Sequence, residues 1–196
     1  MALRHAVLAA LLDGEHSGYQ LAKVFDTAVA NFWHAVPQQL YAELTKLEEA
    51  GLIAGRLVIQ HDRPNKRVYT VTEAGTAELE RFASVASKPS FIRDDLLVKV
   101  QAVDHIDPAP VIAELEERAV QAAAKAGIFE QLLLFLRQDV DEDTFLREGR
   151  RIGPYLTCLR GVLFEHEHQD WCRNTAKLLR SRLDTTPHDH VPGQAH

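Results

Sequence analysis

Apolar residues recur at helical spacing in three segments of the first 50 positions, which predicts three helices. The first runs from Leu3 to about Leu12. The second follows Ser17, which with Gln20 matches a capping box, in which each residue's side chain bonds the other's backbone N–H. The third begins at Pro37, where the missing N–H of proline is harmless. Its core-facing stripe is Leu40, Leu44 and Leu47.

Two runs rich in β-branched residues come next, and they predict a hairpin. The runs are GRLVIQH (55–61) and KRVYTV (66–71), and the four-residue turn between them is Asp62-Arg63-Pro64-Asn65. Thr72 is then placed to cap a fourth helix that ends near Phe82. The order of three helices, a hairpin and a helix predicts a winged helix-turn-helix.

The second half of the chain carries helical periodicity throughout. It predicts a short amphipathic helix around Leu96, a long helix from Pro108 to about Arg137, and a final helix from about Asp143 to Leu183. Pro154 must either kink the final helix or lie in its first turns. The long helix alternates apolar spacings of three and four, as in a coiled coil, so we expect it to pair two subunits. The expected dimerisation residues are Ile112, Leu115, Ala119, Ala122, Ala126, Phe129 and Leu133.

These elements predict a mainly α protein: an N-terminal winged helix-turn-helix followed by an all-helical dimerisation domain with long helices. The boundaries follow from composition. Residues 1–83 form the winged helix-turn-helix, 84–90 a polar linker, 91–184 the helical domain and 185–196 a disordered tail without apolar periodicity.

Composition narrows the function classes. The best apolar run, 128–136, is short and interrupted by polar residues, so we expect no membrane span. Cys158 and Cys172 lie roughly 21 Å apart if their helix is continuous, beyond the roughly 7 Å limit for a disulfide, which suits a reduced, cytoplasmic protein. Neither a nucleophile–base grouping nor a glycine-rich phosphate loop is visible, so we expect no enzyme activity and no cofactor.

Positive charge is concentrated in the hairpin, although the formal net charge of the whole chain is −6. Between Arg56 and Val71 four basic residues, among them Arg63, Lys66 and Arg67, stand against the single acidic residue Asp62. Basic residues also protect the edge of a solvated hairpin from pairing. Phosphate binding explains better why these charges meet at the turn.

The third helix presents polar residues on the face opposite its leucine stripe. At 100° per residue that face holds Gln38, Ala42 and Thr45, flanked by Gln39, Tyr41 and Lys46. Such side chains bond base edges and phosphates, although a merely solvated helix face looks similar. Their position before a basic hairpin favours DNA contact.

In combination these motifs resemble the PadR-like transcriptional regulators. The matching stretches are SGYQL (17–21), FW (32–33), QLYAELTKLE (39–48), AGLI (50–53), RPNKRVY (63–69) and TEAG (72–75). The resemblance is close over about the first 83 residues. The second half, with LRGVLFEHEHQDW (159–171), looks more loosely like the C-terminal domain of the longer PadR subfamily.

The resemblance implies a homodimer that binds an inverted-repeat operator and usually represses transcription, often under control of a small-molecule effector. It also implies roles for individual residues. Gln38, Gln39, Tyr41 and Lys46 correspond to groove or backbone contacts, Asn65, Lys66 and Arg67 to wing contacts, and Ser17 and Tyr19 to positions near phosphate.

Other readings stay open at this level. Phe32, Trp33 and Trp171 are candidates for an effector pocket, although such aromatic residues are more often core. His166 and His168 point about 200° apart on a helix, so we expect no metal site there. One alternative function is a winged-helix module that binds a partner protein. Another is a metal- or redox-responsive sensor that uses these histidines or Cys172.

Overall fold

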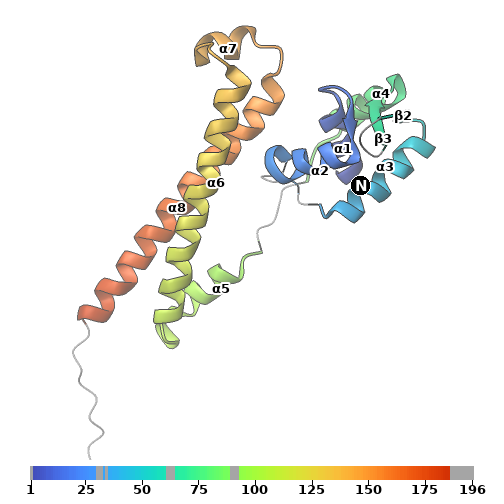
Figure 1. Ribbon diagram of the computed structural model, residues 1–196. Helices are drawn as coiled ribbons and strands as arrows, with labels where there is room; N and C mark the ends of the chain where they lie inside the picture. Colours follow the sequence, from blue (N-terminus) through green and yellow to red (C-terminus); the bar gives the residue numbers. More distant parts are fainter. Residues whose placement is uncertain (1, 30–32, 34, 61–64, 89–92, 186–196) are drawn as a thin grey trace, which may run out of the picture. The chain divides into compact units, whose positions relative to one another are not determined.

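The computed structural model describes residues 2–29, 33, 35–60, 65–88 and 93–185 (Figure 1). The chain forms two compact units. Unit 1 comprises residues 1–90 and 140–158, and unit 2 comprises residues 91–139 and 159–196. The described residues are mainly helical with one small sheet, which confirms the predicted fold class.

Four helices and a π-helical turn form most of unit 1. They are α1 (Ala2–Leu11), α2 (Gly18–Val24), η1 (Phe25–Val29), α3 (Pro37–Glu49) and α4 (Glu73–Ala83). The predicted stripe of α3 lies in the core, where Leu40, Leu44 and Leu47 are almost fully buried with Leu8 and Leu21 of the first two helices. The predicted capping box at Ser17 and the proline start of α3 are both present.

The sheet of unit 1 has three strands rather than the two of the predicted hairpin. Its antiparallel order is β1 (His16–Ser17), β3 (Lys66–Val71), β2 (Ile53–Val58). β1 was missed because two residues carry no periodicity. It exists because Ser17 pairs with Val68 while also capping α2. Residues 62–64 of the predicted turn lie outside the described residues.

Two glycines fix how the sheet joins its helices. Gly51 ends α3 with φ +70°, a left-handed conformation that glycine adopts without cost. Gly75, in the first turn of α4, is buried against Leu52, which precedes β2, and Val71 of β3. A Cβ at this position would lie 2.1 Å from the carbonyl oxygen of Leu52, which accepts a hydrogen bond from Thr72 N–H at 3.1 Å. The Leu52 carbonyl therefore has little room to move.

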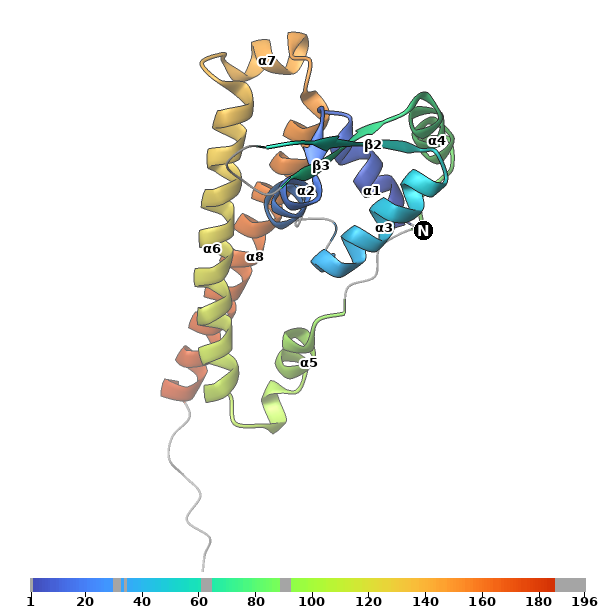
Figure 2. The ribbon, with the colours of Figure 1, turned by 45° about the vertical axis from the view of Figure 1, so that its right-hand side comes forward.

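Unit 2 is helical. It contains α5 (Asp95–Gln101), η2 (Val103–His105), α6 (Ala109–Arg137) and most of α8 (Ile152–Thr185), while α7 (Glu142–Glu148) belongs to unit 1. Both ribbon views show α6 and α8 side by side over much of their length (Figures 1 and 2). Their shared core includes Leu96, Leu115 and Cys172, each completely buried.

The predicted final helix is two helices. α7 ends at Glu148 and α8 begins at Ile152, because Gly149 is extended at ψ 139°. A Cβ at Gly149 would lie 2.5 Å from the carbonyl oxygen of Phe145, so glycine is needed at this break. Of the two predicted alternatives for Pro154, the structure takes the second, since Pro154 lies in the first turn of α8.

The predicted dimerisation stripe of α6 is mostly buried within the single chain. Within unit 2, Ile112, Leu115 and Ala119 pack with Cys172 and Ala176 of α8. Six of the seven stripe residues retain at most 5% exposure, so they are unavailable to a second subunit. The seventh, Leu133, is partly buried. The six are Ile112, Leu115, Ala119, Ala122, Ala126 and Phe129.

The close approach at Gly75 gives a stability prediction for unit 1. Gly75→Ala should lower the free energy of unfolding by about 1–3 kcal/mol, the usual cost of overpacking a rigid site. Gly153→Ala is the matched control, because a Cβ there meets nothing within 4 Å. It should leave stability unchanged or raise it by several tenths of a kcal/mol. Urea denaturation followed by circular dichroism measures both changes, and equal stability of the two variants would contradict the argument.

Candidate nucleic-acid interface

Burial of the α3 leucines leaves the opposite face of that helix in solvent. Gln38, Tyr41, Thr45 and Lys46 are all exposed, as the sequence predicted. Gln39 is exposed too, but its Oε1 accepts a hydrogen bond from the N–H of Val36, the residue before α3, at 3.4 Å. The exposed face therefore offers amide, phenol, hydroxyl and ammonium groups, the set that bonds base edges and phosphates.

The start of α2 lies against this face of α3 at Tyr41. A Cβ on Gly18 would lie 2.3 Å from the Tyr41 ring, so only glycine allows the ring to rest there. Tyr41 keeps 48% of its surface exposed. Contact with α2 thus positions the ring while its outer edge faces solvent.

The two residues predicted near phosphate at the start of α2 lie in different environments. Ser17 is buried, and its hydroxyl accepts from Gln20 N–H and donates to Gln20 Oε1. Tyr19 is 64% exposed, and Lys23 Nζ lies 4.9 Å from its ring centre in a cation–π contact. The Lys23 contact was not predicted, although the spacing of four residues on a helix would have indicated it.

The arginines of the wing, the β2–β3 hairpin, are largely committed to carboxylates of the same chain. Arg56 Nη2 lies 2.6 Å from Glu15 Oε2, and Arg67 Nη2 donates to Glu48 Oε1 near the end of α3. The hydrogen bond to Glu48 raises the pKa of Arg67 above its ordinary value. Both carboxylates are distant in sequence from their arginines, so the sequence pattern could not reveal these pairs.

The remaining wing residues differ in what they offer. Lys66 has no ion pair among the residues that the structure describes and is thus the wing cation most available to a phosphate. Asn65 Oδ1 accepts from Gln60 N–H at 3.1 Å, which leaves its amide group to donate. Arg63, the third predicted basic contact, lies outside the described residues.

The two described aromatics of the predicted effector pocket each pack within their own unit. Trp33 packs against the core of unit 1, and Trp171 packs against the core of unit 2. Phe32 lies outside the described residues. The core reading that was left open therefore describes both tryptophans.

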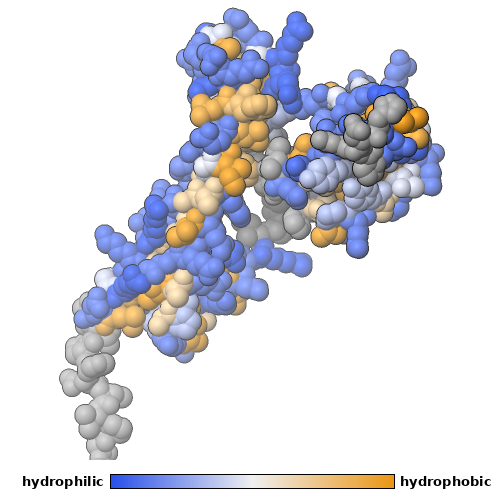
Figure 3. Space-filling view, in the orientation of Figure 1, coloured by the Kyte–Doolittle hydropathy of each residue, from blue (hydrophilic) through white to orange (hydrophobic). Residues whose placement is uncertain are grey.

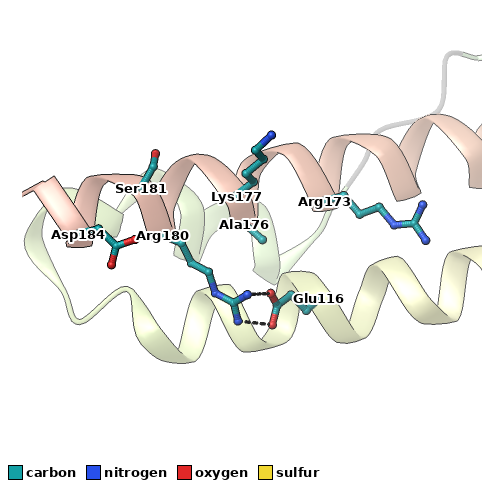
Figure 4. A pocket seen from close by; sticks show the side chains of 7 residues that line it. All are labelled: Glu116, Arg173, Ala176, Lys177, Arg180, Ser181 and Asp184. Atoms are coloured by element: carbon teal, nitrogen blue, oxygen red, sulfur yellow. Dashed lines mark hydrogen bonds and ion pairs between the residues drawn. The ribbon is translucent and has the colours of Figure 1, made fainter.

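A hollow of about 360 Å³ lies along α6 and α8 in unit 2 (Figure 4). Arg173, Lys177 and Arg180 follow one another along α8, and Arg180 pairs with Glu116 of α6 at 2.7 Å. Figure 4 shows this pair bridging α8 and α6, with Lys177 pointing away from α6 and Arg173 lying further along α8. The hollow is lined by both signs of charge, since Glu116 and Asp184 accompany the three basic residues. Sequence reasoning missed it because its charges come from two helices.

The residues proposed for a metal or redox sensor are poorly placed for either role. Burial raises the pKa of the Cys158 thiol to about 11 and also raises that of Cys172, so both are neutral and weakly nucleophilic near pH 7. His166 pairs with Glu130 at 2.8 Å. Across the described residues, histidine, cysteine and carboxylate side chains do not gather in groups of three or more that would hold a metal ion.

Two sequence families match the chain in tandem. Residues 7–81 match the family described as the transcriptional regulator PadR-like family, and residues 92–180 match the virulence activator alpha C-terminal family. Among curated relatives, the probable transcriptional regulator Rv1176c of Mycobacterium tuberculosis is 28% identical, and the alignment covers 93% of this chain and 100% of the relative. The negative transcriptional regulator PadR of Bacillus subtilis is 29% identical, over 90% of this chain and 97% of the relative.

Solved structures share the fold. The crystal structure of Bacillus subtilis PadR in complex with operator DNA matches with a TM-score of 0.74 at 23% identity, and covers 91% of this chain and 99% of that one. The same protein in complex with p-coumaric acid matches with a TM-score of 0.69 at 23% identity, over 91% and 96% of the two chains. At these identities the structures establish the common architecture.

Proposed function

Because the chain belongs to the PadR-like family of transcriptional regulators, we propose that it is a sequence-specific DNA-binding repressor that acts as a homodimer on an inverted-repeat operator. The observation that carries this proposal is the exposed face of α3, held by buried leucines beside a wing that bears Lys66. In this geometry α3 enters the major groove and the wing contacts the adjacent backbone. Repression is supported by the relative named as a negative regulator.

A second apolar face of α6 supports the homodimer. Val120, Ile128 and Phe135 are 68%, 56% and 72% exposed, and they lie within about 80° of one another on the side opposite the buried stripe. Figure 3 shows hydrophobic side chains at the surface along the helices of unit 2. A helix that is apolar on both sides needs a partner on each. We assign the second partner to another copy of this chain, which moves the predicted dimer interface to the outer face of α6.

By length and composition alone, α6 is also the one described helix that could cross a membrane. The charged residues of α6 indicate that the helix packs against protein and does not cross a membrane. Glu116, Lys125 and Glu130 are spread along the helix, and each pairs with a residue of α8. Such pairs and the intervening core are typical of a soluble helical bundle, so we place the protein in the cytoplasm with its DNA.

A small-molecule effector is part of the proposal, whereas catalysis is not. A related protein binds p-coumaric acid, an aromatic carboxylate. In the hollow along α6 and α8, Arg173 and Lys177 are the basic residues that would meet the carboxylate of such a ligand, since Arg180 is paired with Glu116. The chemistry of the family is DNA recognition, so we propose no enzyme activity.

Selection of bound DNA from random sequence tests the function directly. We expect an inverted repeat whose half-site centres lie about 34 Å, or one helical turn, apart, because two α3 helices related by a twofold axis enter successive grooves. Recovery of DNA without a shared motif at moderate salt would contradict the proposal. It would favour the alternative in which the α3 face binds a partner protein.

The wing assignment is tested on the selected operator with Lys66→Ala. The variant should weaken operator and random DNA alike and reduce the slope of log K against log[salt] by about one per subunit, because one phosphate contact is lost. Lys177→Ala, which removes the same charge from unit 2, is the control and should leave the slope unchanged. Fluorescence anisotropy at several salt concentrations measures both. An unchanged slope for Lys66→Ala excludes it as a phosphate contact.

If the outer face of α6 binds a second subunit and the inner face packs against α8, a glutamate introduced on each face should have a different effect. Ile128→Glu, on the outer face, should give a folded monomer, because the charge is buried only on association. Ala122→Glu, on the inner face, should disrupt the α6–α8 core and lower the thermal midpoint of unit 2. Light scattering measures the mass in solution, and circular dichroism shows whether each variant is folded and at which temperature it unfolds. A dimeric Ile128→Glu variant would show that another surface joins the subunits.

A further inference from the structure

The carboxylate of Glu48 joins the recognition helix to both strands of the wing. Its Oε1 accepts from the backbone N–H of Gly55 in β2 at 3.1 Å and from the guanidinium of Arg67 in β3. Gly55 lies opposite Tyr69 and Arg67 opposite Leu57, so Gly55 and Arg67 are diagonal neighbours on one face of the sheet. One oxygen atom thus connects three elements.

The backbone of β2 is adapted to this contact. A Cβ on Gly55 would lie 2.4 Å from Glu48 Oε1 and 2.5 Å from Arg67 Nε. Any other residue would displace the ion pair or the strand. Glycine is unfavourable inside a strand, so its presence here indicates that close approach of the two side chains is what this position requires.

Glu48 also lies on the part of α3 that faces DNA in the proposed function. Tyr41, Thr45 and Glu48 are spaced i, i+4 and i+7, so they form one stripe along the helix. Gly18 fixes this stripe at the Tyr41 end, and the wing fixes it at the Glu48 end. An unpaired carboxylate at position 48 would repel the DNA phosphates. Glu48 is therefore better explained by its contacts to the wing than by contact with DNA.

We propose that Glu48 is a positioning residue that, through Arg67 and the N–H of Gly55, fixes the angle between α3 and the wing and so determines which phosphates the wing reaches. Arg67 then acts as a strut rather than as the phosphate contact that the sequence predicted. Lys66, the neighbouring residue on β3, keeps a phosphate contact with or without this interaction, which decides only which phosphate of the operator it reaches. This inference rests on the proposed DNA-binding function.

The test compares Glu48→Gln, Arg67→Gln and the double variant on the selected operator and on random DNA. Glu49→Gln is the matched control, since it removes the same charge from the next residue, which is exposed and has no ion pair within the described part of the chain. Each single variant should weaken operator binding about tenfold and leave the salt slope unchanged. The double variant should be no weaker than the singles, because both remove one interaction. Binding to random DNA should follow the control.

Several results would contradict the proposed positioning role of Glu48 and Arg67. If Arg67 contacts phosphate and Glu48 only competes for it, Glu48→Gln should tighten DNA binding and Arg67→Gln should lower the salt slope by about one per subunit. Additive losses in the double variant, or an effect of Glu48→Gln no larger than that of Glu49→Gln, also exclude it. Circular dichroism confirms that the variants fold. If the unsubstituted protein itself fails to prefer any sequence, the proposed function is at fault and not the strut.

Discussion

The burial of three leucines beneath α3 is the constraint on which the rest of unit 1 depends. Leu40, Leu44 and Leu47 are each exposed by at most 1%, and together they fix the rotation of α3 about its axis. That rotation alone decides that Tyr41 and Thr45 face solvent. The contacts at Gly18 and Gly55 then hold the helix ends. Hydrophobic packing, and not the polar residues themselves, thus creates the recognition surface.

In unit 2 the comparable constraint is that α6 is apolar on opposite sides. One side is satisfied by α8 within the chain, and we assign the other to a second subunit. The small residues Ala119, Ala122 and Ala126 lie on the inner side, where they allow α8 to approach closely. The outer side carries larger residues such as Ile128 and Phe135, which bury more area at an interface.

Local patterns in the sequence predicted most of the fold because most of its elements are locally specified. The capping box at Ser17, the proline at the start of α3 and the glycine at its end can all be read from a few adjacent residues. The break at Gly149 was missed because apolar spacing continues on both sides of it. Periodicity does not tell which side of α6 packs inside the chain, because both of its sides carry apolar residues.

The candidate site was predictable in outline but not in its electrostatics. Exposed positions on α3 follow from its leucine stripe, and a basic wing is visible as a cluster of charge. That Arg56 and Arg67 are paired with Glu15 and Glu48 depends on contacts between residues 41 and 19 positions apart. Such contacts exist only once the chain has folded. Counting charges in the sequence therefore overstated how many wing cations are free to meet DNA.

The shortest strand has a consequence for motion. β1 is two residues long, and its second residue, Ser17, also caps α2. Ser17 therefore links β1 to α2, because it lies opposite Val68 of β3 while its side-chain hydroxyl caps the first turn of the helix. The wing is thereby connected through Ser17 to the helix whose first residue, Gly18, packs against the ring of Tyr41. Because Ser17 belongs to both elements, a contact that immobilises the wing also restrains the start of α2.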